Sequence, residues 1–600
     1  MALAGRGRDR RWFAERPLGL ACWNLFDLGV VDRRRRGHLD VFTVNHNSRQ
    51  SLLENDGSGR FRDVLSELRL DQDRVFPGWA DDVSAPPLVE PGLYLYREGN
   101  SLIVRSVGGA GHEWISGTLS LDCPVRDLAP SEIDTVVDRA GGGSTSTVVR
   151  FRARGPGRLE LRPELVGLPV TVRLDGEVAL GRVYVGPTMA TPPAPEFVLR
   201  LRDRHGMAWA AIGDAGRLDV FVARGGLRGR LEHYGGVVRD ELFVDTGAGY
   251  EDHAARLGIG KGVCRSRQAG WVPLPGAHGL HLFVSCHGAA PQLHRRGPDG
   301  RFVDVAVDLG LGDVRGDHFA WVDVDGDGWP ELLAVDGARL LVHRFDGGRF
   351  GVHQSVPLRG DRVRKLAVGD YDGDGDADLF APSPGGNTLL VNDGGTYRPV
   401  DPRTVGLPGA GGVTASWVDF DNDGLDDLHL VPGGLFRRRG DGTFAATRLL
   451  EHRLPATVAD ARVTWFDSDG TGSRDVVVAV VATSKADGAG FDWVGRLFAN
   501  VGAAGHWLQV DLEGPPDNPH GLGAAVRVAT AGRTWTRCVG WSEGSHFSQG
   551  HYRVYFGLGR APLADSVTVT WPDGTVDTLG RPAGDERVTI AHTGSGDRPA

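Results

Sequence analysis

Acidic residues recur at a fixed spacing in three segments of this 600-residue chain. Each segment has the form D-x-D-x-D-G-x-x-[DE], with carboxylates at positions 1, 3, 5 and 9 and glycine at position 6. Oxygen ligands spaced in this way wrap a short loop around a hard cation such as Ca²⁺. The carboxylates would repel one another strongly unless a divalent ion lay among them. The pattern therefore predicts three calcium sites, made by Asp323, Asp325, Asp327 and Glu331, by Asp370, Asp372, Asp374 and Asp378, and by Asp419, Asp421, Asp423 and Asp427.

A fourth segment is a weaker copy of the same loop. It contains Asp467, Asp469 and Asp475, but Thr471 replaces the third acid, so a fourth calcium site stays open. None of the loops has the bidentate Glu at position 12 or the flanking helices of an EF-hand. A calcium switch that works by opening helices is therefore excluded.

The segment near the start of the chain departs further from the pattern. Asp27 and Asp32 have a different spacing there, and Arg33 to Arg36 fill the loop. Four neighbouring cations argue against a bound metal. The segments around Trp209 and Trp271 have no acidic triplet and are expected to be free of metal.

The acidic segments also mark a long internal repeat. Their first aspartates are 47, 49 and 48 residues apart, and each loop lies between two apolar strands. A period of about 48 residues is typical of one four-stranded propeller blade. Weaker copies around Trp271, Trp209 and Trp23 bring the number of repeats to seven. The sequence therefore predicts an all-β fold with a seven-bladed β-propeller.

The remaining segments indicate the domain boundaries. Residues 18–75 form the predicted first blade, and residues 201–504 form blades two to seven. Residues 86–200 contain alternating strands of their own around a glycine-rich stretch, which favours an inserted β-sandwich. A C-terminal β domain over 505–583 and a tail over 584–600 complete the chain.

The third to seventh repeats resemble the FG-GAP/VCBS family, whose members form calcium-binding β-propellers. The C-terminal segment is similar to the ASPIC/UnbV domain of cartilage acidic protein relatives and of the UnbV proteins found with enediyne polyketide biosynthesis. The stretches that carry this second likeness are Gly523-Ala524-Ala525-Val526, Ser548-Gln549, Phe556-Gly557-Leu558-Gly559 and Trp571-Pro572-Asp573-Gly574. The resemblance does not extend to 86–200, and it implies no catalytic residue.

Composition excludes several classes of partner and cofactor. A net charge of −10 and a pI near 6.1 lack the basic footprint of a nucleic-acid-binding protein. No apolar run reaches the ~18–20 residues of a membrane span. No phosphate-binding or redox motif stands in a credible context, so neither a nucleotide nor a redox cofactor is expected.

Cysteine content and the N-terminus bear on the compartment. Five scattered cysteines without a CxxC argue against a disulfide framework. No secretory signal is visible at the N-terminus. A cytoplasmic location is therefore expected, or an extracellular one if the N-terminus has been trimmed.

Tryptophan occupies one phase of the repeat, on the strand that enters each loop. Packing between blades is the simpler interpretation, because each blade must bury its face against the next. The alternative is an aromatic-walled substrate pocket in the central funnel. The residues concerned are Trp23, Trp209, Trp271, Trp321, Trp417 and Trp465. Histidines near the C-terminal domain form a further candidate cluster, made of His506, His520, His546 and His551.

Two functions from different classes follow. The first is a protein of specialised metabolism, of polyketide, enediyne-like or terpenoid type, that binds a small hydrophobic or glycosylated substrate in the aromatic funnel. Any reaction would be a non-redox cyclisation, isomerisation or elimination. The alternative is a non-catalytic, calcium-dependent adhesion or glycan-binding scaffold. The expected partner is therefore a small molecule or a glycan, with no nucleic acid and no membrane span.

Overall fold

The computed structural model describes residues 12–20, 25–45, most of 50–70, the strands within 92–199, most of 204–260, 264–450 without 277–278 and 317, 458–481, and most of 493–594. The tryptophan at position 23 and residues 541–544 lie outside these described residues. Almost all regular structure is β-strand, with one helical turn, α1 (Ala254–Leu257), and one 3₁₀ turn, η1 (Pro402–Val405).

Seven four-stranded antiparallel sheets of the described chain share one construction, in which neighbouring strands follow one another in sequence except at the outer strand of the seventh. The first is β2 to β5 (Leu25–Val31, Asp40–Asn45, Leu52–Asn55, Phe61–Asp63). The second is β17, β18, β21 and β22 (Arg204–Ala210, Asp219–Arg224, Glu241–Asp245, Tyr250–Asp252), and the short pair β19 (Glu232–His233) and β20 (Gly236–Val237) lies between its middle strands. The third is β23 to β26 (Ser266–Val272, His281–Cys286, Gln292–Arg296, Phe302–Asp304).

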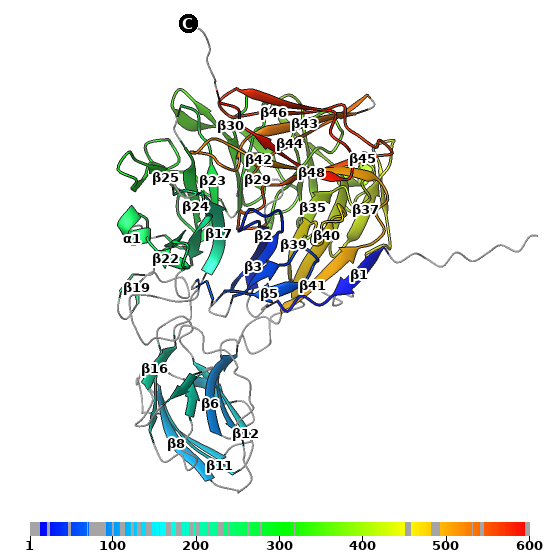
Figure 1. The fold of residues 1–600 in the computed structure, drawn as a ribbon. Coiled ribbons are helices and arrows are strands. Elements are labelled where there is room, and N and C mark those ends of the chain that lie inside the picture. Colours follow the sequence, from blue (N-terminus) through cyan, green and yellow to red (C-terminus); the bar gives the residue numbers. More distant parts are fainter. Residues whose placement is uncertain are drawn as a thin grey trace, which may run out of the picture.

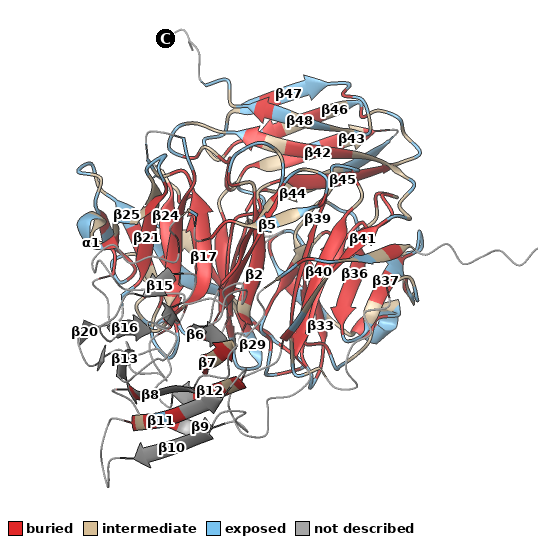
Figure 2. Ribbon diagram, turned by 60° about the horizontal axis from the view of Figure 1, so that its bottom comes forward, coloured by how far each residue is buried: buried red, intermediate tan, exposed pale blue. Residues whose placement is uncertain are grey.

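The next three sheets contain the first three acidic loops. They are β27 to β30 (His318–Val322, Glu331–Asp336, Arg339–Asp346, Arg349–Pro357), β31 to β34 (Ala367–Gly369, Asp378–Ala381, Thr388–Asn392, Tyr397–Val400), and β35 to β38 (Thr414–Val418, Asp427–Val431, Gly434–Arg438, Phe444–Ala446). In each, the acidic loop joins the first strand to the second. The second strands of these sheets are almost entirely buried (Figure 2), whereas most residues of the outer strands β30, β34 and β38 are not.

The seventh sheet combines both ends of the repeat region. It contains β39 (Asp460–Phe466), β40 (Asp475–Val481) and β41 (Trp493–Asn500), and its outer strand is β1 (Phe13–Arg16) from the start of the chain. β1 pairs antiparallel with β41, with Phe13 opposite Asn500. The two strands lie side by side in Figure 1.

Apolar cores lie between neighbouring sheets rather than within one. Alternate residues of a first strand face opposite neighbours, as Ala208 and Trp209 do: Trp209 packs toward β2–β5, and Ala208 packs toward β23–β26. Similar cores join each later sheet to the next, and one joins β39–β41 to β2–β5. This packing is consistent with the predicted propeller blades.

Two further sheets lie at the predicted sandwich, at the lower end of Figure 1. The five-stranded sheet has the order β10-β11-β8-β13-β16 (Asp134–Arg139, Thr147–Arg154, Trp114–Leu121, Val170–Asp175, Glu196–Leu199). The six-stranded sheet has the order β15-β14-β6-β7-β12-β9 (Thr188–Ala190, Val183–Val185, Gly92–Glu98, Ser101–Val107, Gly157–Pro163, Val125–Leu128). Buried side chains such as Leu95, Val149 and Leu159 come from both sheets.

The C-terminal domain has a core of its own. One sheet has the order β45-β42-β48 (Val554–Gly559, His506–Glu513, Glu586–Ala591), and the other has the order β44-β43-β46-β47 (Arg533–Cys538, Ala525–Thr530, Ser566–Thr570, Val576–Gly580). β48 pairs in parallel with β42, so the domain continues past the predicted boundary at 583. Of the described helices, none is long and apolar enough to cross a bilayer.

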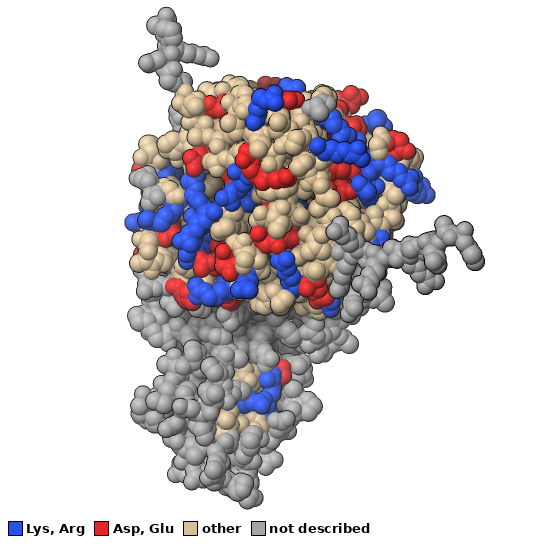
Figure 3. Space-filling view, turned by 45° about the vertical axis from the view of Figure 1, so that its right-hand side comes forward, with Lys and Arg blue, Asp and Glu red and all other residues tan. Residues whose placement is uncertain are grey.

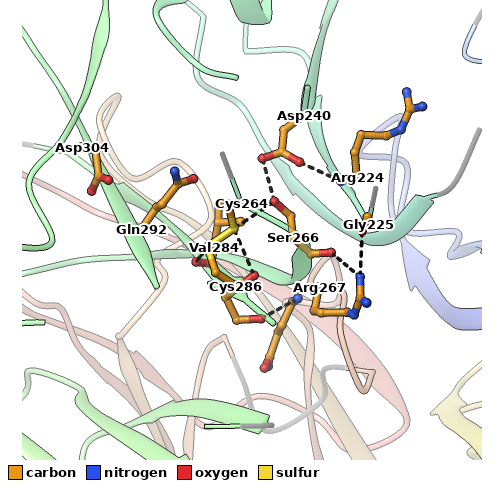
Figure 4. The surroundings of a disulfide bond; sticks show 12 residues. Arg224, Gly225, Asp240, Cys264, Ser266, Arg267, Val284, Cys286, Gln292 and Asp304 are labelled. Carbon is orange, nitrogen blue, oxygen red and sulfur yellow. Dashed lines mark hydrogen bonds between the residues drawn. A yellow bond between two sulfur atoms is a disulfide. The ribbon is translucent and has the colours of Figure 1, made fainter. Parts of the chain in front are cut away.

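The expectation of no disulfide framework needs correction at one position. Cys264 and Cys286 form a disulfide with a Cα–Cα distance of 5.4 Å (Figure 4). The antiparallel register of β23 and β24 sets Ser266 opposite Cys286 and so brings Cys264 within reach, although 22 residues separate the two cysteines. Disulfides persist in oxidising compartments, so this bond favours an extracellular rather than a cytoplasmic location.

Candidate metal centres and the docked C-terminal domain

The first aspartate of each acidic loop organises the backbone of that loop. In the first loop, Asp323 accepts N–H bonds from Gly326 at 2.9 Å and Gly328 at 3.0 Å. Gly328, at position 6, has a φ of +91°, a conformation that L side chains rarely adopt. Asp370 and Asp467 accept the same two bonds from positions 4 and 6, and Asp419 accepts them from positions 5 and 6. The weaker fourth loop thus has the same backbone frame as the others.

The carboxylate at position 9 ties the loop to its sheet. Asp378 accepts one N–H bond from Tyr371, at position 2, and one from Asn392 on β33, both at 2.7 Å. Asp475 does the same with Ser468 at 3.1 Å and Asn500 at 2.6 Å. The position-9 carboxylate therefore stabilises the loop and its sheet through hydrogen bonds that need no metal ion.

Four sets of carboxylate oxygens converge to within 4.8 Å, one set in each loop. All members of the sets are predicted ligand positions, whereas three other predicted residues, Asp327, Asp378 and Asp423, lie outside the sets. The members are Asp323, Asp325 and Glu331; Asp370, Asp372 and Asp374; Asp419, Asp421 and Asp427; and Asp467, Asp469 and Asp475. Such clusters are typical of the calcium sites of FG-GAP repeats.

Electrostatics within the loops fit a divalent cation. Burial, followed by repulsion from neighbouring carboxylates, raises the pKa of Asp419 well above its usual range, and burial likewise raises the pKa of Glu331 to about 8. Asp427 has one oxygen bonded to the Arg438 N–H at 2.7 Å, while its other oxygen is buried without a hydrogen-bond partner. An ion would compensate these charges and cross-link the loop, and its oxygen ligands are those that calcium prefers.

The first sheet carries a related loop in which an arginine side chain, rather than a metal ion, supplies the positive charge. Asp32 accepts N–H bonds from Arg36 at 2.9 Å and Gly37 at 2.5 Å, so it stands at position 1 of the same frame. Asp40 then occupies position 9. The buried Arg33 guanidinium lies 3.5 Å from Asp40 and 2.9 Å from Glu54. A side-chain cation thus compensates acids at positions where the other loops could bind a metal ion.

The five described tryptophans of the repeat phase are buried between sheets. Trp209, Trp271, Trp321, Trp417 and Trp465 are 0–7% exposed, and each belongs to a core shared by two neighbouring sheets. Trp271 and Trp321 also border a cavity of about 230 Å³ under the C-terminal domain. Their arrangement is that of packing residues rather than of one continuous aromatic wall.

A segment of the C-terminal domain, residues 545–551, lies against the first strands of two sheets. Gln549 exchanges backbone bonds with Met207 and Trp209 on β17, at 2.7 and 3.0 Å, and Phe547 accepts the N–H of Ala269 on β23 at 3.0 Å. A side chain at Gly206 would meet the Phe547 carbonyl at 2.4 Å, so only glycine allows this approach. Sequence reasoning recognised Ser548-Gln549 as a family landmark but not as a docking element.

Buried side chains complete the attachment of this segment. The Gln549 side-chain amide forms two hydrogen bonds with the backbone of Trp271. It accepts the Trp271 backbone N–H at 2.7 Å and donates to the Trp271 carbonyl at 3.1 Å. Asp27, which is fully buried, accepts bonds from the Ser545 hydroxyl at 2.6 Å and the Phe547 N–H at 2.9 Å. Asp27 is therefore a docking residue rather than part of a metal loop.

The C-terminal domain also rests on the acidic loops. Gln509 donates to Asp467 at 2.7 Å, and Trp535 donates its indole N–H to the Gly424 carbonyl at 2.7 Å. Gly559 donates to Asn422 at 2.9 Å. Order in the third and fourth loops and docking of this domain are thus coupled by direct contacts.

The candidate histidine cluster does not assemble. Among the described residues, His506, His520, His546 and His551 form no shared set of metal-ligand atoms. His546 is fully buried on the docking segment, and burial lowers its pKa well below the usual range. His506 instead pairs with Asp585 at 2.7 Å.

Loss of the disulfide is expected to weaken the third sheet. Closing a loop of 22 residues stabilises the folded state by about 3 kcal/mol in the chain-entropy model. A double variant, Cys264→Ala with Cys286→Ala, should lose that amount in urea unfolding. Reduced wild-type protein is the matched control and should behave as the variant does. If reductant does not change the free energy of unfolding of the wild-type protein, the expectation is contradicted.

Comparison with known families agrees with these features. Residues 323–381 and 370–430 match the FG-GAP-like repeat, and residues 514–597 match the ASPIC and UnbV family. The chain therefore carries FG-GAP-like repeats and a C-terminal ASPIC/UnbV domain. A search of curated proteins finds no significant match.

Solved structures give distant likenesses only. An Agrocybe aegerita lectin that recognises terminal N-acetylglucosamine is 16% identical, with 49% of this chain and 80% of that chain covered and a TM-score of 0.33. The V. cholerae biofilm matrix protein Bap1 is 13% identical, with coverages of 52% and 60% and a TM-score of 0.26. An extracellular domain of a putative hybrid two-component system of B. thetaiotaomicron is 8% identical, with coverages of 94% and 69% and a TM-score of 0.25. These scores carry no argument about function.

Proposed function

We propose that this protein is a calcium-stabilised, non-catalytic extracellular scaffold that binds glycans, built on a closed seven-bladed propeller. The observation that carries the proposal is the docking of residues 545–551 on the first strands β17 and β23. In a propeller the first strands face the axis, which is where a substrate funnel would lie. A segment bonded to those strands leaves the molecule's binding surfaces on its exterior.

Closure of the ring is supported by a bond that repeats from sheet to sheet. An asparagine on one sheet donates to the carbonyl at loop position 2 of the preceding sheet, as Asn392 does to Val324 at 2.8 Å and Asn500 does to Phe420 at 2.7 Å. Asn55 of the first sheet donates to Ser468 of the seventh in the same way, at 2.8 Å. The first and seventh sheets therefore meet as ordinary neighbours do.

Calcium in the four loops would give this scaffold its rigidity. The third and fourth loops contact the C-terminal domain directly, so ions that order these loops would also order the domain. Sites of this kind in extracellular modules have dissociation constants of roughly 10⁻⁴–10⁻³ M. Such affinities suit an extracellular location, which is also the oxidising environment in which the disulfide would persist.

The surface is compatible with a saccharide partner more than with a nucleic acid. On the face shown in Figure 3, basic and acidic side chains are interspersed over the described area rather than gathered into one basic field. Phosphate backbones require such a field. A scaffold that presents mixed charges instead suits a saccharide, which binds at one local site and needs no extended basic field.

Native mass spectrometry before and after EGTA, followed by a glycan array with and without calcium, tests the proposal. We expect three or four calcium ions, no retained small molecule, and array binding that EGTA abolishes. Retention of a co-purified small molecule with turnover would favour the biosynthetic hypothesis instead. Protein that carries no calcium would overturn the proposal at its foundation.

A further inference from the structure

We infer that the calcium of the second acidic loop is a ligand-binding ion, and that it binds uronic-acid saccharides in a groove beneath the C-terminal domain. The inference rests on the proposed glycan-binding function and names its site and ligand class. The groove has a volume of about 730 Å³ and lies between the second and third acidic loops and the β43–β44 hairpin. Pockets of this size hold small ligands, and a short oligosaccharide fits the range.

The second loop differs from the others in exposure. Asp372 and Asp374 of its set are exposed, whereas all three members of the third set, Asp419, Asp421 and Asp427, are buried. In the first and fourth sets no member is exposed. An ion in the second loop would therefore face the groove, while the other ions would be enclosed by protein.

The position-9 carboxylate of the second loop is already engaged within the protein. Both carboxylate oxygens of Asp378 already accept backbone N–H bonds at 2.7 Å, and Asp378 lies outside the converging set. Calcium takes six to eight oxygen ligands. Hydroxyl and carboxylate oxygens of a saccharide would complete the shell on the open side.

Arginines also line the groove. Arg438 is only 9% exposed, its Nε has no hydrogen-bond partner, and its guanidinium lies beside Gly373 of the second loop. Arg439 and Arg527 are exposed and make no side-chain hydrogen bond or ion pair within the described residues. Guanidinium groups bind carboxylates through paired, charge-assisted hydrogen bonds.

Charge decides between an acidic and a neutral saccharide. The groove is lined by five aspartates (Asp370, Asp372, Asp374, Asp376, Asp426) and five arginines (Arg438, Arg439, Arg527, Arg533, Arg537), so its formal charges cancel. A bound Ca²⁺ adds two positive charges and leaves the groove cationic. The half-buried Trp535 adds an aromatic surface beside the arginines. Together these features select a sugar that carries a carboxylate.

Titration calorimetry of the full chain with trigalacturonic acid tests the inference. We expect binding in calcium, no binding in EGTA, and no binding of the neutral control maltotriose. Arg527→Ala should weaken trigalacturonate binding about tenfold, as expected for one charge-assisted contact. Its melting temperature and calcium count should stay unchanged, because this side chain contacts nothing that the fold needs.

A pair of matched acid variants separates the second loop from the others. Asp372→Asn and Asp325→Asn change position 3 of the second and first loops, and each should cost one calcium in native mass spectrometry. Only Asp372→Asn should abolish trigalacturonate binding. Equal binding by both variants, or undiminished binding by Arg527→Ala, would overturn the inference. If calcium is bound and the glycan array is positive but trigalacturonate is not bound, the groove assignment fails while the scaffold proposal stands.

Discussion

Chelation of calcium is expected to lower the melting temperature by several degrees and to expose the C-terminal domain to proteolysis. Each site filled at about tenfold its dissociation constant contributes about 1.4 kcal/mol to stability, from RT ln(1 + [L]/Kd). Without ions, the buried carboxylates around Asp419 and Asp427 lose their compensating charge. The contacts of Gln509 and Trp535 to these loops should then loosen. Differential scanning calorimetry and limited trypsin digestion, each with and without EGTA, measure the two effects.

A variant of the third loop serves as the control for chelation. Asp421→Ala should lower the melting temperature in calcium and have a smaller effect in EGTA, because without an ion the substitution removes chiefly an ion pair with the exposed Arg437. Asp372→Ala should show the same dependence on calcium. Equal shifts in both buffers would mean that the carboxylates stabilise the fold without a metal. Unchanged digestion after chelation would separate the ions from domain docking.

Gln549→Ala is expected to undock the C-terminal domain. The substitution leaves the Trp271 N–H and carbonyl, both buried, without their partners at 2.7 and 3.1 Å. Each unpaired buried group costs about 1–3 kcal/mol, so a loss of about 2–6 kcal/mol is expected for the two groups. The backbone bonds of Gln549 to β17 would persist only if the segment stayed in place. Urea unfolding and digestion between the seventh sheet and the C-terminal domain report the outcome.

Gln354→Ala provides the matched control for this prediction. The Gln354 amide brackets Tyr397 between two neighbouring sheets, donating at 2.7 Å and accepting at 3.0 Å. Its removal should lower stability by a similar amount but leave the C-terminal domain resistant to digestion. If both variants release the domain equally, docking depends on general stability. If neither does, residues 545–551 are held by other contacts.

Arg33 explains why one repeat departs from the acidic pattern. The spacing of Asp32, Gly37 and Asp40 matches positions 1, 6 and 9 of the other loops, which the sequence alone could have revealed. Sequence reasoning compared Asp27 with Asp32 and so missed the frame. It correctly noted the arginines, but only the fold places the guanidinium of Arg33 between Asp40 and Glu54.

The amino-acid sequence by itself determined the local features of this protein. The acidic spacing, the 48-residue period and the C-terminal motifs depend on residues close together in the chain, and they predicted the loops, the four-stranded sheets and the ASPIC/UnbV domain. A loop of nine residues can bring its own carboxylates together, because the backbone frame is made within it. For this reason the ligand positions of the fourth loop, including Asp469, could be named in advance.

Tertiary structure alone decided the features that join distant segments. The disulfide depends on the register of β23 and β24, and β1 reaches its partner β41 across almost the whole described repeat region. The docking of Gln549 on Trp271 spans 278 residues. No local periodicity encodes such pairings, because they arise when separate apolar faces and buried polar groups find partners only after the sheets have assembled.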